Sequence, residues 1–96
     1  MKRQREEQIG DIIRQFMREE GIETPYNEFR LVQAWPVVVG PAVERCTGKL
    51  FIKNGVLYVQ LTSSVIRHEL FIGRKRLAQR LNDHVGAQVI TNIVFF

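Results

Sequence analysis

The sequence predicts a single α+β domain in which helices pack on one face of a three-stranded sheet, in the order α-α(-α)-β-β-α-β. Three observations lead to this prediction. Apolar residues recur at helical spacing in the first half of the chain and again from residue 64 to 82. An Asn-Gly pair joins two β-rich runs, and a third β-rich run follows the last helix. The length of 96 residues suits one domain, residues 1–96, with one core.

Two helices and a short extension are expected before the sheet. We place the first from Glu6 to Glu20, with Gly21 at its C-terminal cap and residues 1–5 disordered. Its apolar stripe consists of Ile9, Ile12, Ile13, Phe16 and Met17.

The second helix is expected to begin with Thr24 as N-cap and Pro25 in its first position. It should end near Trp35, because Pro36 disfavours the α conformation in the residue before it. Trp35 is expected to pack in the core, with an anchor for a partner as the alternative. A short third helical piece, bent against the second, is indicated by the spacing of Val39, Ala42, Val43 and Cys46.

A β-hairpin is predicted from Lys49–Lys53 and Val56–Leu61, which flank Asn54-Gly55, a sequence typical of a type I′ turn. A two-residue turn fixes the register of the two strands. On the core face this register pairs Ile52 with Leu57 and Leu50 with Val59; on the other face it pairs Phe51 with Tyr58 and Lys49 with Gln60.

One long helix is expected from Ser64 to Asn82, preceded by capping hydroxyl residues at Thr62-Ser63-Ser64. Its core stripe consists of Ile66, Leu70, Gly73, Leu77 and Leu81. The final run, Gln88–Phe96, is expected to be a strand in or beside the sheet.

The basic charge of the chain is concentrated in its second half. Residues 1–48 hold seven basic and eight acidic side chains, whereas residues 49–96 hold seven basic side chains and only Glu69 and Asp83. The second half therefore has a balance of +5, which indicates either a polyanionic partner or a solvated face.

The seven cations of this half are the candidate nucleic-acid contacts. They are Lys49 and Lys53 on the hairpin and Arg67, Arg74, Lys75, Arg76 and Arg80 on the long helix. The alternative for Arg76 and Arg80 is that they pair with Glu69 or with carboxylates of the first helix, and cover apolar surface with their stems. Phe51 and Tyr58 would form a stacking platform for single-stranded nucleic acid if they are exposed. In the alternative, the third strand, a helix or a second chain covers them; we favour partial exposure.

We find no residues that suggest catalysis, a cofactor or a metal. The glycines form no phosphate-binding loop, and neither His68 nor His84 has a partner at ligand spacing. The lone Cys46 cannot form an intramolecular disulfide and is expected to be a small buried hydrophobe in a reduced cytoplasmic protein. No apolar run is long enough to cross a bilayer, and the first residues are no signal peptide. We expect no enzyme, no small-molecule substrate and no membrane partner.

Several of these segments together resemble the DciA family. The resemblance covers nearly the whole chain and is carried by Ala34–Ala42, Lys53–Val59, Ser63–Leu70, Arg74, Leu77, Leu81-Asn82, Val85-Gly86 and Val89–Phe95. Trp35 and Gly40 match the Trp-x-x-x-x-Gly junction of the family, and its helix motif is matched by Arg67, Glu69 and Leu70. The resemblance implies a KH-like fold, although the chain has no Gly-x-x-Gly loop, so its binding surface should differ from that of KH domains.

What the resemblance implies for function is a bacterial protein without enzymatic activity or cofactor that helps to place the replicative helicase on DNA. It also implies affinity for single-stranded or forked DNA; the sequence does not distinguish DNA from RNA. The first hypothesis is thus a nucleic-acid-binding adaptor of the replication machinery that uses the seven cations. The alternative is a protein–protein module without nucleic-acid binding, which docks on a helicase or on a second copy through Ile72, Phe51, Tyr58 or Phe95-Phe96.

Overall fold

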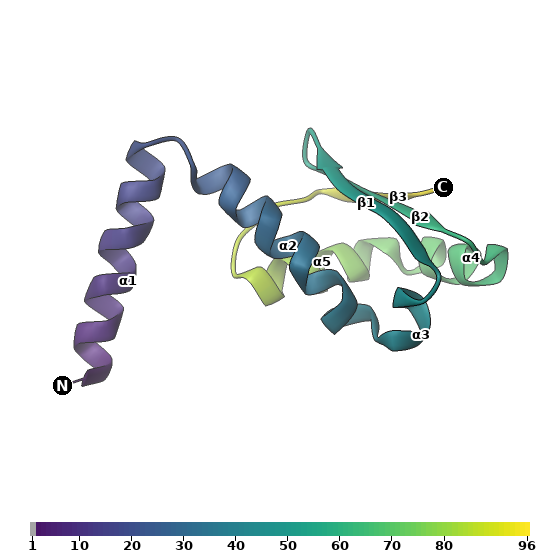
Figure 1. The fold of residues 1–96 in the computed structure, drawn as a ribbon, viewed down its shortest axis with the longest axis horizontal. Coiled ribbons are helices and arrows are strands. Elements are labelled where there is room, and N and C mark those ends of the chain that lie inside the picture. The colour runs from purple at the N-terminus through teal and green to yellow at the C-terminus, as the bar shows by residue number, and fades with distance from the viewer. Residues whose placement is uncertain (1) are drawn as a thin grey trace.

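The computed structural model describes residues 2–96, with side chains from residue 8 onward. Within this range the chain forms helices around one three-stranded sheet (Figure 1). The helices are α1 (Lys2–Glu19), α2 (Glu23–Val39), α3 (Pro41–Glu44), α4 (Ser64–Ile72) and α5 (Arg74–Val85). The strands are β1 (Thr47–Lys53), β2 (Val56–Leu61) and β3 (Asn92–Phe95). The predicted class and order are confirmed, and no helix of the described residues is long and apolar enough to span a bilayer.

Helix α1 ends at a glycine cap, as the sequence predicts. Gly21 has a φ of 72°, and the backbone N–H of Ile22 donates to the carbonyl of Met17 at 2.9 Å, as in a Schellman motif. The helix begins at Lys2, earlier than the predicted Glu6. The disorder expected for residues 1–5 stays a prediction, because Met1 and the side chains of residues 2–7 lie outside the described part of the chain.

The apolar stripe of α1 does not pack on the sheet, whereas α2 and α5 do. In Figure 1, α1 projects away from the rest of the molecule. Ile9, Ile12, Ile13 and Phe16 are each more than half exposed, and only Met17 of the stripe is half-buried. An amphipathic pattern predicts that a helix face will be covered, but it does not specify by what.

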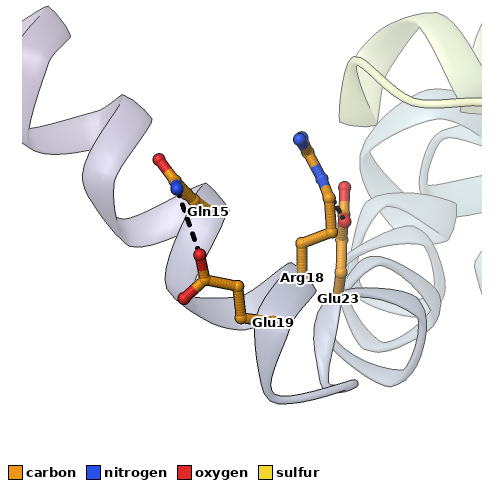
Figure 2. Close-up of polar contacts among 4 residues, drawn as sticks. All are labelled: Gln15, Arg18, Glu19 and Glu23. Atoms are coloured by element: carbon orange, nitrogen blue, oxygen red, sulfur yellow. Dashed lines mark hydrogen bonds and ion pairs between the residues drawn. The ribbon is translucent and has the colours of Figure 1, made fainter.

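Two polar contacts lie at the junction of α1 and α2 (Figure 2). Within α1, Nε2 of Gln15 donates to Oε1 of Glu19 at 3.0 Å. Between the helices, Nε of Arg18 donates to Oε2 of Glu23 at 3.1 Å. An ion pair this exposed contributes at most about 1 kcal/mol, so the junction holds α1 only weakly against the body of the domain.

Helix α2 differs from its prediction at both ends. It begins at Glu23, and the N-cap position is occupied by Ile22, so Thr24 is no cap. Pro25 still lies in the first turn, where a missing N–H costs no helical hydrogen bond. The helix also continues through Pro36 to Val39, instead of ending near Trp35. Burial of Leu31 and Trp35 on one face of α2 outweighs the local preference against helix before proline.

A bend at Gly40 separates α2 from the predicted short helix α3. Gly40 has a φ of 87°, which L side chains rarely adopt, and Pro41 follows as the first residue of α3. This bend returns the chain toward the sheet. Because of the positive φ, a residue with a side chain at position 40 would strain the backbone of the connection.

Trp35 joins α2, α3 and β1 through one hydrogen-bonded chain. Its indole is fully buried, and Nε1 donates to Oγ1 of Thr47 at 3.1 Å. The Thr47 hydroxyl in turn donates to the carbonyl of Val43 at 2.9 Å. The predicted core position of Trp35 is confirmed, with its single polar atom satisfied.

The hairpin has the predicted turn and most of the predicted register. Asn54 and Gly55 have φ values of 52° and 74°, as a type I′ turn requires. The pairs Leu50–Val59, Phe51–Tyr58 and Ile52–Leu57 are present, and the Leu57 and Val59 side chains are fully buried on the core face.

The predicted pairing of Lys49 with Gln60 is wrong, because a β-bulge interrupts β1. The register shifts between Thr47 and Leu50, so that Gly48 and Lys49 together lie opposite Gln60. The Lys49 N–H donates to Oε1 of Gln60 at 3.0 Å. A Cβ at Gly48 would lie 2.5 Å from this oxygen, so any larger residue there would displace the Gln60 amide.

The long helix predicted from Ser64 to Asn82 is divided into α4 and α5. Gly73 separates them with φ −96° and ψ 19°, outside the regular helical conformation, and glycine has a low helix propensity. Ser63 caps α4 as predicted, since its Oγ accepts the Ile66 N–H at 3.3 Å. Across the break, Leu70 and Leu77 both pack in the core.

Strand β3 is shorter than the predicted Gln88–Phe96 and pairs in parallel with β2, which gives the sheet order β1-β2-β3. The residues before β3 are irregular and are held by the buried side chain of Asn82. Its Oδ1 accepts the N–H groups of Val89 and Ile90, both at 3.0 Å, and its Nδ2 donates to the Ile90 carbonyl at 2.8 Å. These three bonds position Ile90 in the core.

The core lies between the sheet and the helices α2 and α5. Leu31 and Trp35 of α2, Leu81 of α5 and Leu57 of β2 are all fully buried in one cluster. The side chains that alternate with Leu57 along β2 lie on the opposite face of the sheet. No helix of residues 2–96 covers that face.

We expect Asn82→Ala to lower the free energy of unfolding by about 3 kcal/mol, because the variant leaves buried backbone groups of Val89 and Ile90 unpaired. Urea denaturation measures the loss. Gln79→Ala, an exposed change on the same helix, is the control and should stay within about 0.5 kcal/mol of the parent. Equal stability of the two variants would contradict this role of Asn82.

Thr47→Val should cost about 1–2 kcal/mol, because it removes the acceptor of the buried Trp35 indole N–H. Thr47→Ser keeps the hydroxyl and should retain most of the stability. Thermal unfolding of both variants, together with the near-UV circular dichroism of the single tryptophan, tests this expectation. A valine variant as stable as the parent would contradict this role of the Thr47 hydroxyl.

Candidate nucleic-acid interface

Two of the predicted cations, Lys75 and Arg76, are exposed on the first turn of α5. Among the side chains of residues 8–96, neither has an ion-pair or hydrogen-bond partner. Neither charge is therefore neutralised within this part of the molecule, and both are available to an anionic partner.

Arg74 and Arg80 each make one local contact and keep further donors. The Arg74 guanidinium lies 4.2 Å from the centroid of the Phe71 ring, and its Nη1 donates to the Phe71 carbonyl at 3.1 Å. Nη2 of Arg80 donates to the Val38 carbonyl in the last turn of α2 at 3.3 Å. A guanidinium has five N–H donors, so both arginines retain free donors for a phosphate.

Arg67 is a structural contact in this arrangement. Its side chain is half-buried, and Nη1 donates to the carbonyl of Leu61 at 2.9 Å, which ties α4 to the end of β2. Of the five predicted helix cations, Arg67 is thus the least available to a ligand.

The acidic residues of the second half do not neutralise these cations. Within residues 8–96 the ion pairs are Arg14–Asp11 and Arg18–Glu23, all in the first half of the chain. Neither Arg76 nor Arg80 pairs with Glu69 or with a described carboxylate of α1, so the alternative based on ion pairing is wrong for the described residues. The same alternative also expected these arginines to cover apolar surface with their stems, and Arg80 does lie against α2.

The outer face of the sheet carries a cluster of aromatic rings. Phe51 and Tyr58 stack with centroids 5.0 Å apart and an interplanar angle of 10°. Phe96 meets Phe51 edge-on at 6.3 Å. Phe51 is 42% exposed and Tyr58 is half-buried, which agrees with the expected partial exposure of this face. Lys49 and Lys53, at the bulge and at the hairpin turn, are exposed.

The two candidate surfaces lie on opposite sides of the domain. Tyr58 points away from the core, whereas its neighbour Leu57 points into it. Helix α5, which carries Lys75 and Arg76, packs on the Leu57 side of the sheet through Leu77. The structure therefore does not unite the hairpin residues and the helix cations in one site.

Four of the five residues that match the family motifs shape the fold, and Arg67 is one of them through its bond to the Leu61 carbonyl. Trp35 and Gly40 form the α2–α3 junction described above, and Leu70 is half-buried against the core. Glu69 is exposed and makes no ion pair with the described side chains.

The remaining chemically reactive residues form no site. His68 and His84 are exposed, and Cys46 is a free, half-buried thiol that packs against the core. No group of three potential metal ligands occurs among the described residues.

Sequence reasoning missed Phe96 as part of the aromatic cluster. The signal for it is the alternation of side chains along a strand: Tyr58 pairs with Val94, so residue 96 lies on the Tyr58 face. That signal becomes readable only when the pairing of β2 with β3 is known, and sequence alone does not supply this pairing.

The comparison with known proteins agrees with the resemblance in the sequence. No curated protein matches the chain. The family model described as "Dna[CI] antecedent, DciA" matches residues 8–95, which leaves out only the first seven residues and the last. The chain therefore belongs to the DciA family, a family linked to DNA replication and the loading of its helicase.

Proposed function

We propose that the chain is a non-enzymatic adaptor that binds single-stranded or forked DNA during loading of the replicative helicase. The observation that carries the proposal is the uncompensated charge of residues 49–96. These residues have a balance of +5, and none of their cations has an ion-pair partner among the side chains of residues 8–96. A surface of this kind attracts a polyanion through counterion release.

The helix surface supplies the backbone contacts in this proposal. Lys75 and Arg76 contribute most, because they have no competing partner in the described structure; Arg74 and Arg80 contribute with their remaining donors. Phosphate contacts of this kind position a strand without reading its sequence. The adaptor thus binds DNA with little sequence preference, which suits a factor that acts wherever a helicase is loaded.

The aromatic face supplies a second, separate contact. Phe51 and Tyr58 present a stacked pair beside the exposed Lys53, and bases stack on such rings in a sequence-tolerant way. Because this face lies opposite the helix surface, one protein molecule can bind the same DNA strand with both surfaces, or one strand of a fork with each surface. Membership of the family supports the replicative helicase as the protein partner.

Single-strand binding should depend on salt through the helix cations. With four phosphate contacts, each with a slope of about −0.7, the affinity should fall about 50-fold between about 50 and 200 mM salt. The double variant Lys75→Gln/Arg76→Gln should lower the slope by about 1.4. Fluorescence anisotropy of a labelled oligonucleotide at several salt concentrations measures both quantities.

Arg30→Gln/Arg45→Gln is the matched control, because it removes two exposed charges from the near-neutral half of the chain. This variant should keep nearly the parent slope. If the parent does not bind at low salt, or if both double variants lower the slope equally, the helix surface is not the site.

The aromatic face should contribute a term that salt does not change. Phe51→Ala should weaken single-strand binding by about 1–3 kcal/mol with an unchanged salt slope, because stacking releases no counterions. Val94→Ala, on the same face but without a ring, is the control. Equal affinities of the two variants in the same anisotropy assay would restrict the sheet face to protein contacts, as the alternative of a protein–protein module requires.

A further inference from the structure

We propose that Phe71 stacks on one base of the single strand whose phosphates the α5 cations hold, so that the junction of α4 and α5 binds both parts of a nucleotide. This inference rests on the proposed function and deepens it, because it assigns a base contact to the surface that carries the phosphate contacts. Phe51 and Tyr58 belong to a separate surface, the outer face of the sheet.

Phe71 is an exposed aromatic ring in the last turn of α4. Its side chain is 50% exposed, whereas Ile66 and Leu70 of the same helix pack against the core. Figure 1 shows α4 at the end of the molecule farthest from α1. Among the side chains of residues 8–96, no other aromatic ring stacks on Phe71. The ring is therefore accessible to a partner at one end of the domain.

The Arg74 side chain holds this ring in a cation–π stack. Its guanidinium carbon lies 4.2 Å from the centroid of the Phe71 ring, and Nη1 donates to the Phe71 carbonyl at 3.1 Å. Unpaired bases stack on aromatic rings and on guanidinium planes alike, so a base can extend this stack. Because the two side chains already restrain each other, little side-chain freedom remains to be lost on binding.

Contacts for the phosphates follow within the next few residues. Arg74 keeps N–H donors at the edge of its guanidinium, and Lys75 and Arg76 are exposed without a partner among the described side chains. Phe71 and Lys75 are four residues apart, so their Cα atoms lie within about 15 Å of each other. At the duplex spacing of about 3.4 Å per nucleotide, four or five nucleotides span that distance. One short strand therefore reaches the ring and the cations together.

The charge around Phe71 favours a nucleic acid over an apolar protein surface. Residues 70–82 hold four cations, Arg74, Lys75, Arg76 and Arg80, and no acidic side chain. An apolar partner that covered the ring would desolvate the neighbouring charges without neutralising them, which is unfavourable. A single strand supplies a phosphate for each cation and a base for the ring, the combination that single-strand sites use.

Phe71→Leu tests the proposal by fluorescence anisotropy with a labelled oligothymidylate. The variant keeps an apolar side chain but removes the ring, and stacking of one base changes the affinity by roughly 5- to 150-fold. Binding should therefore weaken at least about 5-fold, with an unchanged salt slope because stacking releases no counterions. Phe71→Tyr keeps a ring and should bind like the parent.

Phe29→Leu is the matched control, because Phe29 is 62% exposed on α2 in the near-neutral half of the chain. It should bind the oligothymidylate like the parent. Circular dichroism of all variants verifies that the domain stays folded, as expected for exposed positions.

A fully abasic strand of the same length separates stacking from other effects of the substitution. This strand retains its phosphates but has no bases, so the parent and Phe71→Leu should bind it with equal affinity. If Phe71→Leu acts only by displacing Arg74, the difference between the two proteins persists on the abasic strand.

Phe71→Trp reports the contact directly through tryptophan fluorescence. Trp35 is the only tryptophan of the parent and is fully buried, so its emission should change little on binding. The tryptophan introduced at position 71 should be quenched when a base of unlabelled oligothymidylate stacks on it. Phe29→Trp should show no such quenching.

Two results would overturn this inference and leave the proposed function standing. The first is a Phe71→Leu variant that binds the oligothymidylate as tightly as the parent, which would leave Phe71 to a protein partner. The second is an equal loss of affinity on the normal and the abasic strand. A parent chain that binds no single strand at low salt is a different outcome, because it contradicts the proposed function itself and this inference with it.

Discussion

The fold depends on the burial of one face of β2 against α2 and α5. Leu57 and Val59 on that face are fully buried, together with Trp35 and Leu81 from the two helices. In a small sheet, helices that seal one face leave the other to solvent. The aromatic pair Phe51–Tyr58 is consequently outside the core, and α5 with its cations packs on the opposite face of the sheet. The positions of both candidate surfaces therefore follow from which face of the sheet α2 and α5 cover.

The exposed stripe of α1 and the uncompensated positive charge lie in different halves of the chain. The near-neutral first half carries the exposed stripe of α1, whereas residues 49–96 carry the uncompensated positive charge. An apolar stripe favours a partner that can be desolvated, and a basic surface favours a hydrated polyanion. The two surfaces belong to different elements, so a substitution in one need not change the other.

Sequence patterns predict the conformation correctly where it depends only on adjacent residues. They fail where contacts with residues distant in the sequence favour another conformation. The Asn54-Gly55 turn and the Ser63 cap are predicted correctly, because each involves a few adjacent residues. The sequence predicts that α2 ends before Pro36, but the helix continues through it. The sequence also predicts one helix through Gly73, but the helix is interrupted there. Packing of Trp35 carries α2 through the proline, while the need for α4 and α5 both to reach the core makes the glycine a break.

The sequence by itself determined the class of the fold, the hairpin register around Phe51 and Tyr58, and the half of the chain that holds the basic charge. Only the tertiary structure decided where these features lie relative to one another. The β-bulge at Gly48, the parallel pairing that brings Phe96 to Phe51, and the separation of α1 from the sheet all depend on contacts between distant segments. Periodicity reports which face of an element is apolar, but the element that covers that face is chosen by packing in three dimensions.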